Sequence, residues 1–519
     1  MITLDGQSLT LDETIAIAHG ASVTLAAAAR DRVAAARLVV NDFADHDDPT
    51  YGINTGFGSF ADVRIPHESL AELQINLLRS HAAGVGDPLP VPAVRATMAL
   101  RANVLAKGFS GIRVETLDLL LAMLNRGVIP VVPSRGSVGA SGDLAPLAHL
   151  ALVLIGEGHA TIEAGSPVDL GQDPHGGSIG TVLSGGDALA AAGLQPIALA
   201  PKEGLALING TQPSTALLGI ALDGAEQLAR TADIAAALSI DGLQGSTTPF
   251  DPRIHAARPF TGQSVVAANL SGLLADSGIN ASHANCGRVQ DAYSMRCAPQ
   301  VHGAARDAFG YVHRVFAIEA NAATDNPMVF TATREIVSGG NFHGAPVSVA
   351  ADLLCLGVAQ LATISERRSD RLVNPASSGL PAFLTRHGGL QSGLMMAQVT
   401  AAALTSELKG LAHPASVDTI PTSGNKEDHV SMSMTAAHKA CRAVELARLV
   451  VAVELLCAAQ AIDLLHPLES SPALMPVHRA LRTRVPTLEH DRPPSPDLAA
   501  IAAMIARGEL ERACARKVN

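Results

Sequence analysis

The stretch from residue 429 to about residue 465 limits what this chain can fold into more than any other. Apolar residues surround the expected helix on most of its faces, and only a few charged side chains interrupt them. A helix that is apolar on most faces must be buried among other helices. Pro467 then ends it, because proline cannot continue a helix. We therefore expect a long helix that belongs to a central bundle.

The composition favours helices as well. Of the 519 residues, 48% are hydrophobic but only 3% are aromatic, and tryptophan is absent. Alanine and leucine must therefore fill the core, which favours closely spaced helices over sheets. A chain of this length can bury a large core. These observations predict a mainly α fold.

The charge pattern excludes several classes of partner. The formal net charge is -11 and no basic stripe is present, which argues against nucleic acid or an anionic membrane. The apolar stretch Gly204 to Leu222 contains Asn209 and Pro213, so it is a poor membrane span. The six cysteines show no CxxC spacing, which indicates reduced thiols. Acidic residues in the first twenty positions argue against a secretory leader, so we expect a cytoplasmic protein.

The local patterns predict the following elements along the chain. A short strand is expected at residues 2–4, and Thr10 with Glu13 fits a capping box before the next helix. Further helices are predicted over residues 24–43, 92–127 (two helices, broken near 108–111), 144–155, 214–240, 346–373 and 393–412. Residues 241–263 are predicted as a long polar connection. Ser495 is the expected N-cap of a last helix, with Pro496 in its first turn.

Residues 134–144, Ser-Arg-Gly-Ser-Val-Gly-Ala-Ser-Gly-Asp-Leu, allow two interpretations. Such small residues mark turns, and Ser or Asp near a helix start caps it, so this can be a plain capping loop. Alternatively, the amide nitrogen of Gly142 attacks the carbonyl carbon of Ala140 and closes a ring across Ser141. Only a residue without Cβ allows so close an approach. Loss of water from the ring and from the Ser141 side chain then leaves an electron-poor methylidene carbon, which no standard side chain provides.

The segment at residues 139–149, Gly-Ala-Ser-Gly-Asp-Leu-Ala-Pro-Leu-Ala-His, resembles the signature of the aromatic amino acid ammonia-lyases. In that family the triplet cyclises autocatalytically to the methylidene-imidazolone (MIO) prosthetic group. The resemblance implies an MIO group formed from Ala140, Ser141 and Gly142. No metal is expected, because the chain lacks clustered Cys/His spacing. The glycine run at 176–180 lacks a phosphate-loop motif, so no nucleotide is expected either.

Two loops before the triplet resemble family segments. Residues 51–58, Tyr-Gly-Ile-Asn-Thr-Gly-Phe-Gly, contain one of only three tyrosines; they could form a plain surface loop, but they resemble the loop that carries the catalytic tyrosine, Tyr51. The pair Ser80-His81 matches two positions that face the substrate ring in related lyases. Phenylalanine-specific relatives tend to carry Phe-Leu there and tyrosine-specific ones His-Leu, whereas Ser-His resembles the histidine-specific type. An imidazole substrate needs polar partners, because burying its ring nitrogens unpaired is costly.

Further matches place more residues in the implied active site. Asn209, which could simply be the polar end of a helix, matches the asparagine that hydrogen-bonds the prosthetic group. Residues 289–301 resemble the segment that contributes Gln290, a catalytic Tyr293 and Arg296. An arginine before a helix is usually part of a surface ion pair, but its planar fork is well suited to bind a substrate carboxylate.

Two later segments complete the set. Phe342 matches a residue that lies against the prosthetic group. Glu427 matches a glutamate that contacts the imidazole in histidine-specific members and that phenylalanine and tyrosine relatives usually lack. Without the resemblance, this charged cluster would be a solvated helix start. Lys426 stands where glutamine is usual, and this departure concerns the hydrogen bonds beside the prosthetic group.

The resemblance covers nearly the whole chain and implies long, roughly parallel helices in a central bundle, with small strand and loop elements near the N-terminal part. It implies a single unit over residues 1–519: an N-terminal part (1–200) with the tyrosine loop and the triplet, a helical bundle (201–490) and a C-terminal helix (491–519). It also implies a homotetramer whose active sites are shared between subunits.

The implied reaction is the elimination of ammonia from L-histidine to give trans-urocanate. Tyr51 removes the β-proton, Arg296 binds the carboxylate, and His81 with Glu427 orients the imidazole. A phenylalanine or tyrosine ammonia-lyase or an aminomutase of the same family is the alternative. Fumarase-type lyases also form helical tetramers, but their GSSxMPxKxNP loop is absent. A helical scaffold without activity would not need Tyr51, Ser141 and Arg296 together.

Overall fold

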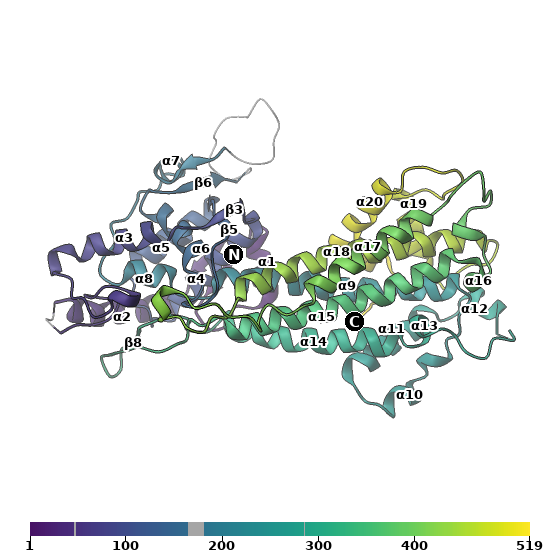
Figure 1. Cartoon of the computed structure of the whole chain (residues 1–519), viewed down its shortest axis with the longest axis horizontal. Helices are drawn as coiled ribbons and strands as arrows, with labels where there is room; N and C mark the ends of the chain where they lie inside the picture. The colour runs from purple at the N-terminus through teal and green to yellow at the C-terminus, as the bar shows by residue number, and fades with distance from the viewer. Residues whose placement is uncertain (46–47, 164–180, 285) are drawn as a thin grey trace. The chain divides into compact units, whose positions relative to one another are not determined.

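A computed structural model describes residues 1–45, 48–163, 181–284 and 286–519 (Figure 1). The described chain is mainly α-helical, as expected, with a few strands of two to four residues. It divides into two compact units. The first unit comprises Met1–Ile220, His313–Ala351 and Pro414–His438, and the second comprises Ala221–Val312, Asp352–His413 and Lys439–Asn519. Each unit is therefore assembled from segments that are far apart in the sequence.

The first unit holds all the strands of the described chain. Its elements up to residue 208 are β1 (Ile2–Leu4), α1 (Leu11–Ala18), β2 (Val23–Leu25), α2 (Ala27–Asp45), α3 (Leu70–His81), β3 (Val85–Pro88), α4 (Val91–Ala106), α5 (Val114–Asn125), β4 (Val128–Pro130), β5 (Pro133–Arg135), α6 (Leu144–Leu154), β6 (His159–Ile162), β7 (Leu183–Ser184), α7 (Gly185–Ala191) and α8 (Glu203–Ile208). The pair β1–β2 is parallel, and β3–β5, β4–β6 and β6–β7 are antiparallel. A later hairpin, β8 (Met328–Phe330) with β9 (Glu335–Val337), is antiparallel too.

Helices α3, α6 and α8 of the first unit position the candidate site. Helix α4 is buried on every face from residue 93 to residue 106, so it lies inside this unit rather than on its surface. Helix α6 packs against both α3 and α8, and α3 also contacts α8. His81 is the last residue of α3, the Ala-Ser-Gly triplet lies just before α6, and Asn209 directly follows α8. The mutual packing of these helices therefore brings the sequence-predicted residues into one region.

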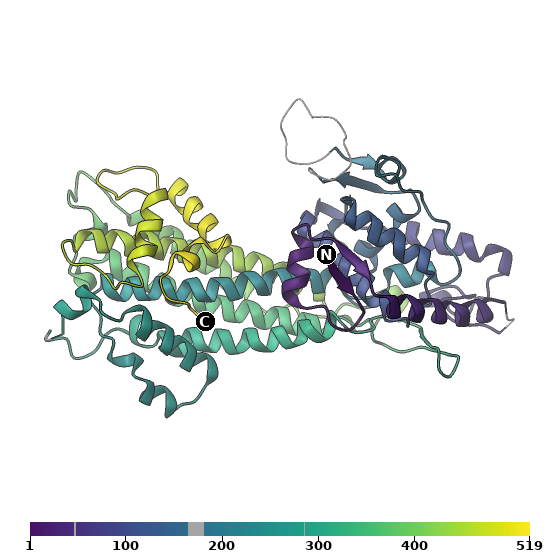
Figure 2. The same cartoon turned by 180° about the vertical axis from the view of Figure 1, so that it is seen from behind.

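The second unit is built around long helices. Four helices pass through both units: α9 (Gln212–Gly242), α14 (Ala298–Glu319), α15 (Ala345–Val373) and α18 (Ser433–Leu464). Within the second unit these helices run side by side and roughly parallel, together with α17 (Met395–Leu411) (Figures 1 and 2). The part of α18 that lies here is almost entirely buried from Val450 to Ile462. The expected long central helix and the expected bundle are thus confirmed.

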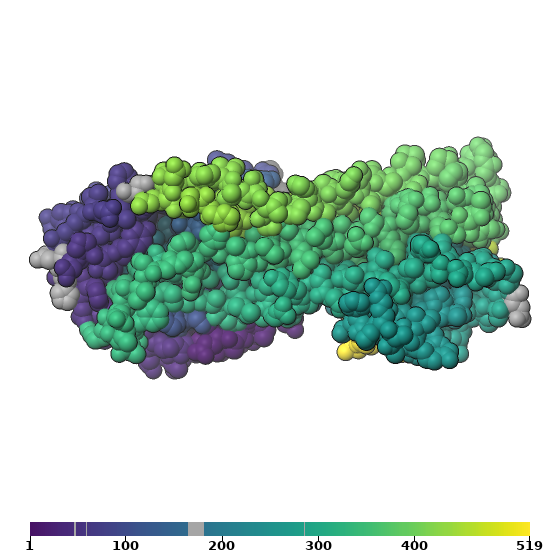
Figure 3. Space-filling model, turned by 60° about the horizontal axis from the view of Figure 1, so that its bottom comes forward, coloured from purple at the N-terminus to yellow at the C-terminus, as the bar shows by residue number. Residues whose placement is uncertain are grey.

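Shorter helices complete the second unit: α10 (Pro252–Ala256), α11 (Thr261–Leu273), α12 (Gly278–Ser282), α13 (Tyr293–Arg296), α16 (Pro375–Ser378), α19 (Met475–Arg484), α20 (Ser495–Ala506) and α21 (Glu509–Ala513). Helices α15 and α17 come to the surface of this unit (Figure 3), and Gln398 of α17 donates a hydrogen bond to Glu366 of α15 (2.9 Å). Helix α15 is the one described helix that is long and apolar enough to cross a membrane, but 67% of its most apolar window is buried inside the protein, as in a core helix.

Three local predictions are corrected by the structure. Thr24 and Leu25 lie in β2 instead of opening the helix, which begins at Ala27. The region 241–263 is not one polar connection: Asp251 caps α10 through a hydrogen bond to the Arg253 amide, and proline occupies the first turn. Ser495 is the first helical residue of α20, and the N-cap position is taken by Pro494, which makes no side-chain capping hydrogen bond. The division of the chain at residues 200 and 490 stays a prediction.

Candidate active site

The triplet lies in a sharp loop between β5 and α6. Gly142 has a φ of 73°, which favours glycine, and its backbone forms a parallel bridge with Gly210. A Cβ on Gly142 would lie 2.3 Å from the Gly210 carbonyl oxygen, so no side chain fits there. The amide of Asp143 also donates to that oxygen (2.7 Å). The absence of a side chain at residue 142 is therefore required by packing as well as by the proposed ring closure.

Two other segments hold the residues just before the triplet. The Gly139 carbonyl oxygen accepts hydrogen bonds from the Gly344 amide (3.1 Å) and from Ser431 Oγ (2.8 Å). The Met432 amide donates to the Val138 carbonyl oxygen (2.8 Å). Ala140 packs in a small apolar cluster with Val430 and Met432. The loop is thus fixed by segments that are up to about 290 residues away in sequence.

Ser141 is bound at both its polar groups. Its hydroxyl donates to Glu427 Oε1 (2.7 Å), and its carbonyl oxygen accepts a hydrogen bond from Asn209 Nδ2 (2.9 Å). The structure therefore brings Ser141, Asn209 and Glu427 together, although they are widely separated in the sequence. The Asn209 Oδ1 atom is buried and has no hydrogen-bond partner among the described residues.

The carboxylate of Glu427 is held by a tight turn. Its second oxygen, Oε2, accepts hydrogen bonds from Thr422 Oγ1 (2.6 Å) and Ser423 Oγ (2.9 Å). Burial opposes ionisation of this carboxyl group, but the three hydroxyl hydrogen bonds, with a last contribution from the nearby His81 imidazole, outweigh it and hold the pKa of Glu427 below its usual value. An ionised carboxylate therefore lies beside the triplet.

His81 stands at the end of α3 with a defined tautomer. Its Nδ1 lies 2.8 Å from the Leu77 carbonyl oxygen, which can only accept, so Nδ1 carries the proton and Nε2 is an acceptor. Burial lowers the pKa of His81, although the Leu77 carbonyl and the charge of Glu427 oppose that shift. Ser80 and His81 line an apolar pocket of about 780 Å³ with Phe57 and Ser423.

Tyr51 begins the glycine-rich loop that the sequence pointed to. Burial and the charge of Glu427 raise the pKa of its phenol, and a hydrogen bond with the backbone of Gly58 opposes the increase. The Tyr51 ring makes an edge contact with Phe57, with centroids 6.2 Å apart. The influence of Glu427 on the pKa values of both Tyr51 and His81 shows that all three groups share one electrostatic environment.

Sequence reasoning missed residues that support this site. Arg101 is fully buried in α4 and donates to the Asn209 carbonyl oxygen (2.8 Å) and to Gln212 Oε1 (2.7 Å). Asp143 is also fully buried and accepts hydrogen bonds from Ser137 (2.7 Å) and Ser214 (2.7 Å). Burial raises the pKa of Asp143, while these hydrogen bonds oppose the shift. A charged residue inside an otherwise apolar helical pattern is the one signal that could have indicated Arg101.

Gln290, Tyr293 and Arg296 belong to the second unit and are not in the group described above. Gln290 and Arg296 line a cavity of about 580 Å³ formed by residues of that unit. The Arg296 guanidinium lies 4.7 Å from the centre of the Tyr293 ring, which is a cation–π contact. Tyr293 and Arg296 both stand on α13, so this short helix determines where they point.

Phe342 lies in the turn that precedes Gly344, whose amide binds the triplet loop. Its predicted contact with the prosthetic group stays a prediction. Lys426 is exposed, next to the half-buried Glu427. In the described parts of the chain, no group of three or more His, Cys, Asp or Glu residues could hold a metal ion. The glycine run at 176–180 lies outside the described residues.

Comparison with known proteins shows the family to which the chain belongs. The sequence profile described as aromatic amino acid lyase matches residues 9–483, and the chain belongs to that family. A histidine ammonia-lyase of Anaeromyxobacter sp. (strain K) is 56% identical over 513 residues, covering 98% of this chain and 99% of the relative. The crystal structure of histidine ammonia-lyase from Trypanosoma cruzi superimposes with a TM-score of 0.89 at 43% identity, covering 99% of this chain and 94% of that one.

A tyrosine aminomutase from Streptomyces globisporus has the same fold. Its crystal structure gives a TM-score of 0.92 at 36% identity and covers 100% of both chains. The backbone is therefore at least as similar to an enzyme with another substrate and another reaction. The fold defines the family, but the choice of substrate must be argued from the side chains.

Proposed function

We propose that this member of the aromatic amino acid lyase family eliminates ammonia from L-histidine and releases trans-urocanate. One observation carries the proposal: an ionised Glu427 is held beside Ser141, in the same unit as His81. The carboxylate accepts a hydrogen bond from one ring N–H of the substrate, and the two polar groups meet the needs of a buried imidazole. A phenyl ring would leave Oε1 of Glu427 without a donor, although Oε2 keeps Thr422 and Ser423.

The residues around the triplet fit the MIO group that the family uses. Gly142 has no room for a side chain, and Asn209 Nδ2 already donates to the oxygen that becomes the ring carbonyl. The unpartnered Asn209 Oδ1 leaves an acceptor available there. When formed, the group supplies an electrophilic carbon that turns the substrate amine into a better leaving group. Asn209 withdraws electron density from it through the carbonyl oxygen.

The side chains of the first unit then perform separate tasks. Tyr51 removes the β-proton of the substrate. Its phenol must lose its own proton first, and burial raises the pKa of that phenol. The substrate ring in its imidazolium form donates one N–H to His81 Nε2 and the other to Glu427 Oε1, once the Ser141 hydroxyl has been eliminated. These contacts fix the ring so that the β-carbon faces the base.

The carboxylate of the substrate requires a cation, and Arg296 of the second unit is the candidate, with Gln290 and Tyr293 beside it. We propose that a neighbouring copy of the chain supplies α13, so that a homotetramer completes its active sites between subunits. Exposed apolar side chains on the second unit support self-association: Leu356 (45% exposed), Leu390 (90%), Met396 (59%) and Val399 (46%). The reaction would take place in the cytoplasm, where the six cysteines stay reduced.

Two measurements test the proposal. Intact-mass spectrometry should find the chain lighter than its sequence mass by two waters, and Ser141→Ala should abolish that difference together with nearly all activity. Separate incubations with L-histidine, L-phenylalanine and L-tyrosine should give an ultraviolet-absorbing unsaturated acid from histidine alone. A chain that prefers phenylalanine or tyrosine, or that forms a β-amino acid as an aminomutase does, would contradict the assignment. An unshifted mass in an active protein would contradict the MIO group.

A further inference from the structure

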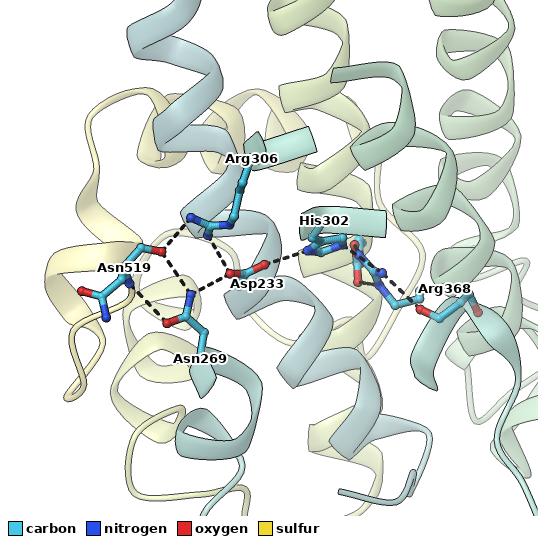
Figure 4. Close-up of polar contacts among 8 residues, drawn as sticks. Asp233, Asn269, His302, Arg306, Arg368 and Asn519 are labelled. Carbon is cyan, nitrogen blue, oxygen red and sulfur yellow. Dashed lines mark hydrogen bonds and ion pairs between the residues drawn. The ribbon is translucent and has the colours of Figure 1, made fainter. Parts of the chain in front are cut away.

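A chain of charged and polar side chains crosses the interior of the second unit (Figure 4). Asp233 on α9, His302 on α14, and Arg368 on α15 with Glu454 on α18 are all fully buried. Arg368 forms a double hydrogen bond with Glu454, Nε to Oε1 (2.5 Å) and a terminal nitrogen to Oε2 (2.9 Å). Ionised side chains are very rarely buried unless they are paired, and the proposed chemistry uses none of these four.

The hydrogen bonds of His302 set the direction of this network. Nδ1 lies 2.7 Å from Asp233 Oδ1, so it donates its proton to the carboxylate. Nε2 then accepts from a terminal nitrogen of Arg368 (3.4 Å). Burial lowers the pKa of His302, the bond to Asp233 opposes this, and the charge of Arg368 lowers it further. A neutral His302 is therefore the form that can accept from Arg368.

The remaining hydrogen bond of Arg368 leaves the network. The same terminal nitrogen that faces His302 also donates to the backbone carbonyl oxygen of Ser294 (3.2 Å). Ser294 lies on α13, between Tyr293 and Arg296. Met295 of the same helix is buried, and its methyl group lies where a Cβ on Gly245 would be only 2.4 Å away. Helix α13 is thus held from two sides, by packing and by the Arg368 guanidinium.

We infer that Arg368 is a positioning residue for the carboxylate-binding side of the active site: it fixes α13, and with it the stacked pair Tyr293 and Arg296. Glu454 and His302 hold the guanidinium in the orientation that reaches Ser294. A guanidinium is required, because its three nitrogens reach Glu454, His302 and Ser294 together, which the single ammonium group of lysine cannot do. This inference rests on the proposed function for its catalytic consequence, but not for the anchoring of α13.

The test is Arg368→Lys, which keeps the positive charge opposite Glu454 but removes the fork. Arg306→Lys is the matched control: Arg306 lies on α14, and its hydrogen bonds among the described residues go to Asp233 (2.6 Å) and to the Asn519 carbonyl oxygen (2.7 Å). Amide hydrogen exchange of a peptide covering residues 293–297 should be faster in Arg368→Lys than in wild type and unchanged in Arg306→Lys. Equal exchange in all three proteins would overturn the inference, whatever the activity.

The kinetic test separates carboxylate binding from general damage. Arg368→Lys should raise the KM for L-histidine by about tenfold or more, because small misplacements of binding groups are costly. The inhibition constant of histamine, which has no carboxylate, should stay within about twofold. A parallel loss for both compounds, or a similar effect of Arg306→Lys on KM, would mean a merely structural role. Loss of two waters in the mass spectrum should be complete in both variants.

The outcome stays interpretable if single variants are unstable. Should circular dichroism show that Arg368→Lys is unfolded, the pair Arg368→Met with Glu454→Gln removes both charges together, which avoids leaving one buried charge unpaired. The same exchange and KM results are expected from that pair. Wild type that releases no ammonia from L-histidine would defeat the proposed function alone, and the exchange experiment would still decide the role of Arg368.

Discussion

At the scale of single residues, the two carboxylate oxygens of Glu427 have different partners. One carboxylate oxygen accepts from Ser141 and the other from Thr422 and Ser423. When Ser141 loses its hydroxyl, Oε1 loses its donor, and a substrate N–H can replace it. The residue that helps to keep the precursor in place is therefore the one that we expect to bind the imidazole afterwards.

Glu427→Gln tests this role. The amide keeps the shape of the side chain but loses the charge, so histidine turnover should fall by at least roughly tenfold, on the order of one charge-assisted hydrogen bond. Steady-state kinetics measure the loss, and the intact mass is the control. A variant that has lost two waters and still processes histidine at the wild-type rate would show that Glu427 does not bind the substrate.

Tyr51→Phe tests the base. The ring volume is retained, so packing against Phe57 should survive. General base catalysis contributes typically about 10²–10⁴-fold, and a weakly acidic C–H should need the upper part of that range. Turnover of L-histidine should therefore fall by at least about 10²-fold with the mass loss unchanged. Retention of more than about a tenth of the wild-type turnover would assign the proton transfer to another group.

The sequence indicated the reacting residues better than their supports. Ser141, His81 and Glu427 lie in glycine-rich or charged segments that stand out against an alanine-rich chain. Thr422 carries no such signal, because a threonine before a turn is an ordinary surface residue in most sequences, and Arg101 carries only the weak signal of a charge within an apolar helix. The hydrogen bonds from Thr422 to Glu427 and from Arg101 to Asn209 can be seen only in the folded chain.

At the scale of elements, the turn at residues 422–427 acts as a clamp. Thr422 and Glu427 form an antiparallel bridge, and Ser423, Gly424 and Asn425 between them all have positive φ. Positive φ is costly for residues other than glycine. The chain accepts this local cost at the place where it presents the Thr422 and Ser423 hydroxyls to a single carboxylate oxygen.

Thr422→Val should weaken this clamp without changing its branched shape. One of the hydrogen bonds that lower the pKa of Glu427 is lost, so that pKa should rise. The proposed active form is the carboxylate, and therefore the acid limb of the kcat/KM profile for L-histidine should move to higher pH. The same measurement on Ser423→Ala should give a shift in the same direction. An acid limb at the wild-type position in both variants would contradict the clamp.

The elements themselves were largely predictable, for a physical reason. Long helices such as α9, α15 and α18 follow from apolar periodicity over many residues. The predicted helix boundaries were wrong where a residue fits two structures. Ser495 can cap a helix or begin one, and Thr24 fits a strand or a helix. Helix α10 was missed because its signal, Asp251 followed by a proline, lies in a polar stretch that has no apolar period.

At the scale of the whole molecule, the two units could not be read from the sequence, because each is assembled from three separated segments. The sequence also did not show that Gln290, Tyr293 and Arg296 lie in the second unit. The resemblance only implied that they belong to the active site. In our proposal the surface that they face belongs to another copy of the chain, and no local pattern encodes it.

Global stability should depend on Asp241, which is buried in the second unit and accepts hydrogen bonds from Ser277 (2.9 Å) and Ser470. Burial raises its pKa from 3.8 to about 6, against the opposing effect of these hydroxyls. The native state therefore binds more protons than the unfolded chain between these two pH values, so this group lowers the stability as pH rises through that window. Above about pH 6 the full penalty remains.

Asp241→Asn should remove that penalty. Urea unfolding midpoints of the variant and wild type should differ in favour of the variant at pH 8, and the difference should shrink at pH 5, where wild-type Asp241 is largely protonated in the folded state. Circular dichroism in both buffers measures the midpoints. A difference that is equal at the two pH values would mean that hydrogen-bond geometry, and not ionisation, sets the effect.

The contacts of the triplet loop make the proposed covalent change at Ser141 depend on prior folding of the chain. Gly139 and Gly142 meet Gly344, Ser431 and Gly210 only when distant parts of the chain have closed around them. The proposed dehydration at Ser141 is covalent and would persist when the chain is later unfolded. A chain that has formed the proposed group would thus keep a permanent mark of having once been folded. In a denatured sample, the fraction with the lower mass would count the chains that had reached the native fold, and the fraction with the full mass would count those that never did.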